Sequence, residues 1–258
     1  MYKKIQIKKI YYSPIKSFNF VESNEVRIFK DLGIENDRIF AFVRNMSKEN
    51  AIKFQNKQHL RNNQSYLSVK NTPILNNYQV KFLNSKLEIY FKGKKLISIP
   101  KIEFNELQNV VSFLKRKENI LQNKEIYLLY NNKVPFYDMI NDNVISLINL
   151  ETLKDFEIKT GLSIDHQRFR ANIIVDTIKP MEELKFINKN IMIGKVVFKV
   201  FSNIPRCKAT NYPYKSDKQD LNFPQKLNEI YGHIDFGIYL KPISSGQINL
   251  NDTVSFEL

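Results

Sequence analysis

The single cysteine of the chain, Cys207, lies between two basic residues, Arg206 and Lys208. A strand-like run and Pro205 precede it, so we expect it at a strand end or in a loop. Positive neighbours favour the thiolate form, which binds soft metal ions or attacks electrophiles. The alternative is a small apolar residue packed in a core. With one cysteine, an intramolecular disulfide and a zinc site of several cysteines are excluded.

Two arginines and an asparagine alternate in the segment Arg168-Phe169-Arg170-Ala171-Asn172. In a strand, residues two apart share a face, so Arg168, Arg170 and Asn172 would project together. Two guanidinium groups and an amide suit a phosphate or a polar heterocycle. The alternative is a solvated strand face, since most charged side chains stay in water.

Two short segments near the N-terminus also carry anion-binding side chains. Lys16 and Ser17 follow the first strand-like run, and Arg38 follows Gly33 by five residues. A lysine and a hydroxyl can grip an anion together, and Gly33 suits a turn. Each piece alone is also an ordinary surface feature.

Other motifs are missing or uninformative. There is no Gly-rich phosphate loop, no G-x-S-x-G and no H-E-x-x-H, and His59, His166 and His233 show no metal-site spacing. The net charge is +14, which fits an anionic partner such as nucleic acid, a membrane surface or a phosphate-bearing cofactor. The lysines are scattered, however, and a general excess of Lys, Asn and Ile is the favoured explanation of the charge.

Short apolar runs dominate the elements that must position these residues. Strands are predicted at 4–11, 39–43, 66–69, 78–82, 86–91, 125–130, 144–148, 173–175, 191–193, 196–201, 236–240 and 253–256. Two pairs, 78–82 with 86–91 and 191–193 with 196–201, are typical of hairpins. Helices are predicted at 103–118, at 150–160 between Asn149 as N-cap and Gly161, and at 223–231.

The pattern predicts a mainly β protein with a few helices. Short, regularly spaced strands favour barrels over a parallel α/β sheet. We expect a β-rich N-terminal domain at 1–120 and a second β-barrel-like domain at 121–258. No apolar stretch is long enough to span a membrane, and the N-terminus lacks signal-peptide features, so a cytoplasmic location is expected.

Taken in order, six segments resemble the MOSC family, in the form that carries an N-terminal β-barrel extension. Tyr12 to Ser17 resembles Y-P-V-K-S, 33–40 resembles G-L-x-x-D-R-x-[WF], and 168–173 resembles R-F-R-P-N-I. The remaining three are 206–211, which resembles R-C-x-x-T-x, 231–239, and 246–254, which resembles G-x-I-x-x-G-D-x-V. No single motif is specific, but their order along nearly the whole chain is.

The resemblance implies a molybdenum–pterin cofactor (Mo-molybdopterin) with Cys207 as metal ligand and catalytic residue. It assigns the pterin and its phosphate, or the lining of the site, to nine further residues: Lys16, Ser17, Arg38, Arg168, Arg170, Asn172, Arg206, Thr210 and Tyr239. Relatives include the mitochondrial amidoxime reducing component. The family therefore implies an oxidoreductase that reduces N-hydroxylated or other N–O compounds, a small-molecule substrate class.

The chain departs from the family pattern at several positions. Ala171 replaces a proline, the segment after Thr210 lacks D-P-x-T-G, and Asn251 stands where a glycine usually precedes Asp252. No four-cysteine module follows, so no iron–sulfur cluster is expected. Electrons would then come from a separate ferredoxin- or flavoprotein-like donor.

Two other functions stay open. Cys207 as a persulfide carrier would make the protein a sulfurtransferase in cofactor maturation. A basic nucleic-acid-binding β protein is the third, although scattered charge and the missing aromatic platform argue against it. Pyridoxal phosphate and a membrane partner are not expected.

Overall fold

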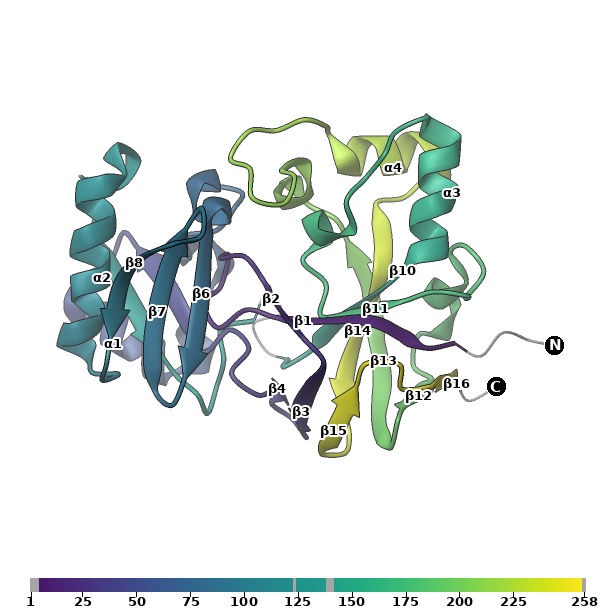
Figure 1. The fold of residues 1–258 in the computed structure, drawn as a ribbon, viewed down its shortest axis with the longest axis horizontal. Coiled ribbons are helices and arrows are strands. Elements are labelled where there is room, and N and C mark those ends of the chain that lie inside the picture. The colour runs from purple at the N-terminus through teal and green to yellow at the C-terminus, as the bar shows by residue number, and fades with distance from the viewer. Residues whose placement is uncertain (1–4, 123, 138–141, 257–258) are drawn as a thin grey trace. The chain divides into compact units, whose positions relative to one another are not determined.

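The computed structural model describes residues 5–122, 124–137 and 142–256, and contacts divide the chain into two compact units (Figure 1). Unit 1 contains Met1–Tyr12, Glu22–Glu35 and Asp142–Leu258, and unit 2 contains Ser13–Val21 and Asn36–Asn141. Two N-terminal segments therefore belong with the C-terminal half. The expected domain boundaries, 1–120 and 121–258, stay a prediction.

Unit 1 is built on an eight-stranded, mostly antiparallel sheet. Its strand order is β16 (Val254–Phe256), β12 (Asn190–Ile193), β13 (Val196–Pro205), β14 (Asp235–Pro242), β10 (Ile145–Asn149), β11 (Ile173–Val175), β1 (Ile7–Tyr12) and β2 (Val21–Ser23). Among the described residues of this sheet, β10 and β11 pair in parallel. The pairs β1–β11, β10–β14, β12–β13, β12–β16 and β13–β14 are antiparallel. A smaller sheet contains β15 (Gly246–Asn249), β3 (Glu25–Phe29) and β4 (Gly33–Ile34).

The large sheet curls until its ends meet. Gln6 and Thr253 form an antiparallel bridge, and the Val254 amide donates to the Ile5 carbonyl at 2.9 Å. The chain just before β1 thus pairs with β16, and seven strands form a ring. The expected β-barrel-like domain is confirmed.

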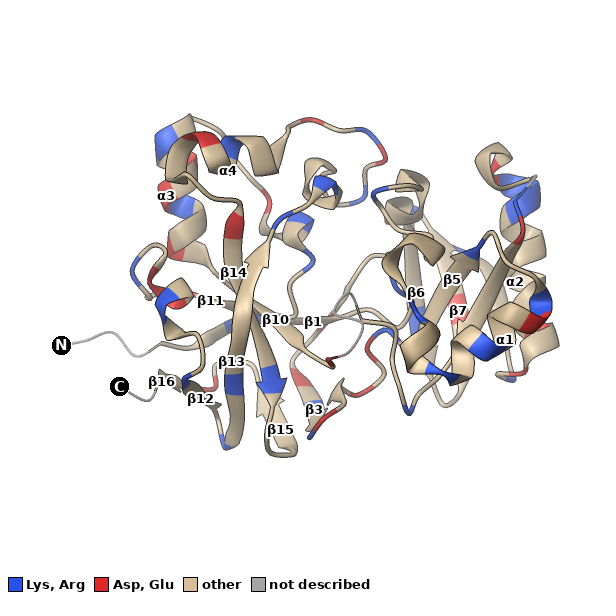
Figure 2. Ribbon diagram, turned by 180° about the vertical axis from the view of Figure 1, so that it is seen from behind, with Lys and Arg blue, Asp and Glu red and all other residues tan. Residues whose placement is uncertain are grey.

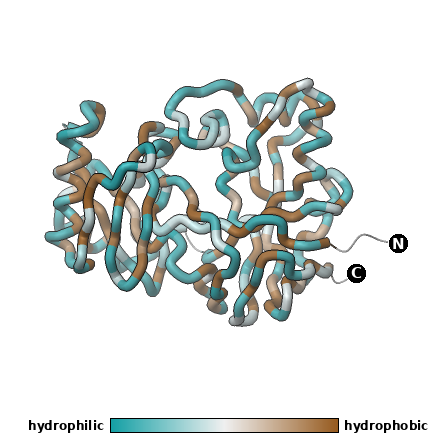
Figure 3. The backbone as a smooth tube through the Cα atoms, viewed as in Figure 1, coloured by the Kyte–Doolittle hydropathy of each residue, from teal (hydrophilic) through white to brown (hydrophobic). Residues whose placement is uncertain are grey.

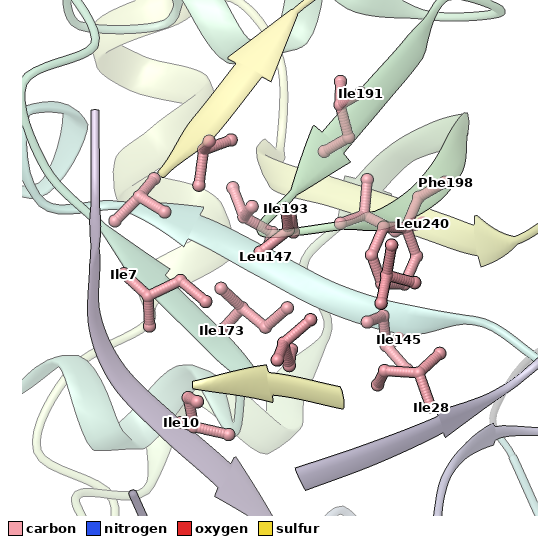
Figure 4. Packing of buried hydrophobic residues seen from close by; sticks show 14 of the residues in the cluster. Ile7, Ile10, Ile28, Ile145, Leu147, Ile173, Ile191, Ile193, Phe198 and Leu240 are labelled. Carbon is pink, nitrogen blue, oxygen red and sulfur yellow. The ribbon is translucent and has the colours of Figure 1, made fainter. Parts of the chain in front are cut away.

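Alternate apolar residues of these strands fill the ring. Ile7, Ile145, Ile173, Ile193 and Leu240 are fully buried and pack together (Figure 4). Burial of each such side chain stabilises the fold by roughly 1.5–3 kcal/mol. Figure 3 colours several of these strands brown, whereas the loop before α4 is largely teal.

Two helices of unit 1 begin and end where the sequence predicts. In α3 (Leu150–Thr160), the Asn149 side chain accepts from the Glu151 amide, and Gly161 ends the helix at φ 70°. The helix α4 (Phe223–Tyr231) ends at Gly232, at φ 73°. Both glycines adopt the left-handed conformation that ends many helices. Short 3₁₀ helices include η5 (His166–Phe169), η6 (Glu182–Phe186) and η7 (Lys208–Asn211).

Unit 2 packs two small sheets with two helices around a separate core. One sheet pairs β5 (Phe40–Arg44) with β9 (Ile126–Tyr130), and the other joins β6 (Tyr78–Leu83), β7 (Lys86–Phe91) and β8 (Lys94–Ile99). The helices are α1 (Lys48–Asn56) and α2 (Phe104–Lys117). The helix predicted at 103–118 is confirmed, and α2 buries Leu107, Val110, Val111 and Leu114.

Most predicted elements are present, and both hairpins are confirmed. The strand at 66–69 is wrong, because only Tyr66 forms a bridge, with Val43, before the chain turns. The first predicted residue of the first strand, Lys4, lies outside the described residues. Helix α1 and the strands β2, β3, β4, β8 and β15 were not predicted. Helix α1 buries only Ala51 and Phe54, too few to give a clear period.

Among the described residues, no helix combines the length and the apolar character that a membrane span requires.

Candidate functional site

Cys207 lies directly after the end of β13, as expected. Its side chain is exposed, so it is not a small core residue. Its carbonyl accepts from the Thr210 amide at 3.0 Å and from the Thr210 hydroxyl at 2.9 Å, which fixes the turn into η7. The predicted site residue Thr210 thus holds the backbone beside the thiol.

Arg206 is buried and joins three segments around Cys207. Its guanidinium donates from Nε to the Phe236 carbonyl at 2.8 Å and from Nη1 to the Phe169 carbonyl at 3.1 Å, and Nη2 also donates to the Phe236 carbonyl. Burial lowers the pKa of this group to about 10, although the nearby Tyr239 and Cys207 side chains oppose that effect. Arg206 therefore links η5 and β14 to the backbone next to Cys207.

Aromatic rings surround that guanidinium. Phe169 and Phe236 stack with centroids 4.4 Å apart, and the Arg206 guanidinium carbon lies 5.2 Å and 5.7 Å from the two ring centroids. Phe223 of α4 contacts both rings. The cation thus gains from ring contacts as well as from hydrogen bonds.

Gly237 permits this close packing, a role that the sequence did not reveal. Its φ is +87°, and a Cβ atom there would lie 2.5 Å from the Leu147 carbonyl oxygen and 3.3 Å from Nη2 of Arg206. Only glycine fits this backbone conformation and this space.

The predicted strand face at Arg168 is wrong. Arg168 lies in η5, where the Asp165 side chain accepts from the Gln167 amide, and Arg170 follows in the left-handed conformation at φ 53°. The strand β11 begins only at Ile173. Because local capping replaces the extended backbone, Arg168, Arg170 and Asn172 do not share a strand face.

Arg168 is nevertheless buried in a way that indicates an anion site. Its side chain is 2% exposed, and Nη2 donates to the half-exposed carboxylate of Asp220 at 2.6 Å. Its Nε and Nη1 have no hydrogen-bond partner among the residues that the structure describes. Buried N–H groups without partners are costly, and those of a cation more so. The Asp220 amide donates to the Asn211 carbonyl at 3.2 Å, which links Arg168 to the turn after Cys207.

Asn172 has a structural environment. It is fully buried, its Oδ1 accepts from the amide and hydroxyl of Ser146, and its Nδ2 donates to the Tyr11 carbonyl at 3.1 Å. These contacts join β10, β11 and β1. Tyr239 is half-buried on β14, where Ser202 and Ser146 are its cross-strand neighbours.

Sequence reasoning missed a hydrogen-bonded pair on η5 and β1. The Tyr11 hydroxyl and Nε2 of His166 are 3.1 Å apart, and Nδ1 of His166 lies 3.7 Å from Asp165. Burial raises the pKa of Tyr11 to about 12 and lowers that of His166, so both are neutral at pH 7. The sequence gives no indication of this Tyr11–His166 pair, because the two residues are 155 positions apart in the chain.

The other three predicted residues lie together in unit 2. Lys16 is buried, with Nζ 4.9 Å from the centroid of the Tyr66 ring, and Ser17 follows at φ 73°. Arg38 pairs with the buried carboxylate of Asp37. Ser13 joins the two segments, since its amide donates to Asp37 at 2.7 Å and its carbonyl accepts from the Arg38 amide at 2.7 Å.

No cluster of three or more His, Cys, Asp or Glu side chains suited to a metal ion occurs in the described ranges. A metal at Cys207 would therefore have one thiolate from the protein and take its other ligands from a cofactor or solvent.

The family model described as "MOSC domain" matches residues 135–255. Two relatives are named "Molybdenum cofactor sulfurase". The one from Drosophila ananassae is 33% identical over 127 residues, covering 46% of this chain and 16% of its own length. The one from Drosophila pseudoobscura pseudoobscura is 31% identical over 111 residues, covering 42% and 13%. The chain thus spans less than a fifth of these relatives.

Two solved structures are similar at low sequence identity. The YuaD protein from Bacillus subtilis is 11% identical, with 98% of this chain and 97% of that chain covered and a TM-score of 0.44. YiiM from Geobacillus stearothermophilus is 17% identical, with 44% and 54% covered and a TM-score of 0.35.

Proposed function

We propose that the protein binds a molybdenum–pterin cofactor, because residues 135–255 match the model of the MOSC domain. The relatives named molybdenum cofactor sulfurase support a role connected with this cofactor. The finer proposal is a molybdenum-dependent oxidoreductase that acts on N–O compounds.

The observation that carries the proposal is the buried guanidinium of Arg168. It needs acceptors for Nε and Nη1, and a phosphate oxygen on a pterin side chain is an acceptor of matching charge and geometry. The residues present thus fit an anionic cofactor. Arg170, two residues along the chain, would add positive charge. The assignment of Lys16, Ser17 and Arg38 to the cofactor rests on the family resemblance alone.

Cys207 is the proposed metal ligand and catalytic residue. Its side chain is exposed two residues after the end of β13, and the Thr210 contacts fix the backbone beside it. Arg206 would position this residue rather than touch the cofactor, because its donors already bind backbone carbonyls. Thr210 and Tyr239 would line the same site.

The bound cofactor would supply two-electron redox chemistry, while the protein binds and orients. The proposed reaction consumes an N-hydroxylated compound, two electrons and two protons. The N–O bond breaks, an N–H bond forms, and the oxygen leaves as water. A separate donor protein would supply the electrons.

Sulfur transfer is the second candidate, and the exposed thiol favours it. Cys207 in the persulfide form would hand its outer sulfur to an acceptor. The names of the curated relatives point in the same direction.

The test compares wild-type protein with Cys207→Ser and Arg168→Gln, each made in a host that synthesises the cofactor. Lys208→Gln is the matched control, because it removes an exposed charge beside Cys207. We expect near-stoichiometric molybdenum and oxidisable pterin in wild type and control. Cys207→Ser should lose the metal, and Arg168→Gln should lose pterin and metal together.

Two results would contradict the proposal. Wild-type protein without molybdenum and pterin, but with cyanide-releasable sulfur that Cys207→Ser lacks, would establish sulfur transfer instead. Full pterin content in Arg168→Gln would remove Arg168 from the cofactor site.

A further inference from the structure

A buried phenol and a half-buried imidazole in unit 1 form a hydrogen-bonded pair that the proposed function does not yet use. The Tyr11 hydroxyl lies 3.1 Å from Nε2 of His166, and the two ring centroids are 5.9 Å apart. Tyr11 is 3% exposed, whereas the side chain of His166 is 26% exposed and that of Asp165 beside it 48%. The pair therefore reaches from solvent, through the imidazole, to a hydroxyl inside the protein.

Strand alternation places Tyr11 on the outer face of the curled sheet. Ile10 and Tyr12, its neighbours in β1, pack against the core inside the ring. On β14 and β10, Tyr239 and Ser146 likewise alternate with core residues. Side chains that alternate with inward ones point outward, so Tyr11, Ser146 and Tyr239 share the outer face.

Cross-strand contacts join these residues into one row. Tyr239 is the strand partner of Ser146, whose amide and hydroxyl donate to the Asn172 side chain. Asn172 in turn donates from Nδ2 to the Tyr11 carbonyl at 3.1 Å, and its own carbonyl accepts from the Tyr11 amide at 2.7 Å. Tyr11 therefore lies at the same level of the sheet as Tyr239, a residue proposed to line the site.

The helix η5 brings His166 to the same region. It carries Arg168, the proposed phosphate contact, two residues after His166. The Phe169 carbonyl of this helix accepts from Arg206, and η5 contacts η7, which begins directly after Cys207. The imidazole thus lies on the element that joins the anion site to the backbone beside the thiol.

We infer that Tyr11 is the proton donor of the proposed reduction and that His166 returns a proton to it from solvent. The inference rests on the proposed function, whose reaction takes up two protons with two electrons from the donor protein. The Tyr11 hydroxyl proton passes to the leaving oxygen as the N–O bond breaks, which releases water. The phenolate then takes the Nε2 proton of His166 while Nδ1 of that ring takes one from solvent. The substrate nitrogen takes the second proton from solvent.

The proton affinities of the two groups suit these roles. Burial, followed by the negative charge of Glu22, raises the pKa of Tyr11 to about 12, and Asp165 and Tyr214 act in the same direction. The hydroxyl therefore keeps its proton until the reaction. Water, the conjugate acid of a leaving hydroxide, has a pKa of about 16, so transfer of the proton to that oxygen is favourable. Burial lowers the pKa of His166, so the ring is neutral at pH 7 and can exchange one proton for another.

Charged side chains around the pair leave the solvent side of the imidazole accessible to protons. They are Lys9 of β1, Glu22 of β2 and Asp165 before η5, and Figure 2 colours the charged residues along the ribbon. Lys9 and Glu22 pair with each other at 2.5 Å, whereas Asp165 lies 3.7 Å from Nδ1 of His166. An exposed carboxylate beside Nδ1 can pass protons between solvent and the ring.

The other side chains of the row are less suited to donate a proton. Asn172 and Ser146 are hydrogen-bonded to each other, and amides and aliphatic hydroxyls hold their protons too tightly. Tyr239 is a second phenol, and it lies near the guanidinium of Arg206. Tyr11 has a hydrogen-bonded imidazole that can restore its proton, which is the reason for assigning the role to it.

The experiment uses holoprotein with Tyr11→Phe, which removes the hydroxyl alone, or with His166→Ala. The matched controls are Tyr231→Phe, which removes a hydrogen-bonded phenol hydroxyl on α4, and His59→Ala, which removes an exposed imidazole in unit 2. Reduction of an N-hydroxylated amidine is followed with a viologen radical as electron donor. Molybdenum and pterin content is measured in every protein.

Tyr11→Phe should lower kcat by about 100-fold and change KM by less than about twofold, because a general acid contributes on this scale to the reaction step rather than to binding. His166→Ala should lower kcat by about tenfold, and added imidazole should restore most of it. Cofactor content should equal that of wild type. A comparable loss of kcat in the two controls would overturn the inference.

Tyr239→Phe is measured beside these variants. A large loss of kcat there, with the wild-type rate in Tyr11→Phe, would overturn the inference and make Tyr239 the donor.

A second measurement does not depend on turnover. Labelling with ¹⁵N-histidine reports the proton on each ring nitrogen of the three histidines by nuclear magnetic resonance. The Nε2 signal of His166 should shift in Tyr11→Phe and stay unchanged in Tyr231→Phe. An unchanged signal in Tyr11→Phe would show that the hydrogen bond is absent and would overturn the relay.

Failure of the inference differs from failure of the proposed function. A wild-type kcat in Tyr11→Phe rejects Tyr11 as the donor, while the proposed reaction stands. If wild type holds the cofactor but reduces no N–O compound with the viologen radical, the proposed reaction fails and the donor role fails with it.

Discussion

Truncation of Arg206 should destabilise unit 1 by about 3 kcal/mol. The change to alanine removes three hydrogen bonds to the carbonyls of Phe236 and Phe169. Hydrogen bonds from a charged donor contribute about 2 kcal/mol each, or roughly 6 kcal/mol together. Against this stands the cost of burying the cation, which the alanine variant no longer bears.

That cost follows from the pKa. Burial lowers the pKa of Arg206 from 12.5 to about 10, which corresponds to roughly 3 kcal/mol. A lowered pKa means that the charged guanidinium is less favourable in the folded protein than in the unfolded chain. This free-energy cost of burying the charge is therefore present at every pH below about 10. Subtracting it from the hydrogen-bond contribution leaves the net loss of about 3 kcal/mol.

Urea denaturation followed by far-ultraviolet circular dichroism measures this loss, since the chain has no tryptophan. Lys208→Ala is the control. Because this side chain is exposed, its removal should change the free energy of unfolding by less than about 0.5 kcal/mol. In Arg206→Lys the charge is kept, but the lysine ammonium cannot reach both carbonyls. The free energy of unfolding of this variant should therefore fall by about 2 kcal/mol. If Arg206→Ala costs less than about 1 kcal/mol, Arg206 does not hold η5 and β14 together.

Three further predictions concern unit 1. Gly237→Ala should cost more than about 3 kcal/mol in the same denaturation assay, because its Cβ would lie 2.5 Å from the Leu147 carbonyl; near-wild-type stability would contradict the close approach. Burial raises the pKa of Glu183, so its stabilising contribution is present below the unfolded-state value near 4.5 and is lost as pH rises through the folded-state value. Glu183→Gln should therefore gain stability relative to wild type between pH 4.5 and pH 8, and a pH-independent difference would refute this. Asp220→Asn should bind inorganic phosphate more tightly than wild type, in calorimetric titration, because Asp220 competes for Arg168; weaker binding would make Asp220 part of the site instead.

The sequence determined most of the strands and the helix ends. Asn149 caps α3 and Gly161 ends it because both act on their own backbone, which sequence shows directly. The missed helix α1 and the wrong strand at 66–69 have few local signals. Asn251 adopts φ 68°, so the position where relatives usually have glycine requires a left-handed residue, which asparagine tolerates.

The candidate site also has features that the sequence predicts and features that only the tertiary structure determines. The sequence predicted that Cys207 follows a strand, which is confirmed, whereas Arg168 as an anion-binding residue stays a prediction. Only the tertiary structure decided that Arg206 donates to the carbonyls of Phe169 and Phe236, whereas two buried nitrogens of Arg168, Nε and Nη1, have no hydrogen-bond partner among the described residues. Both arginines look alike in sequence, because a side chain's role depends on which acceptors distant segments bring to it, and those contacts form only when the ring of strands closes.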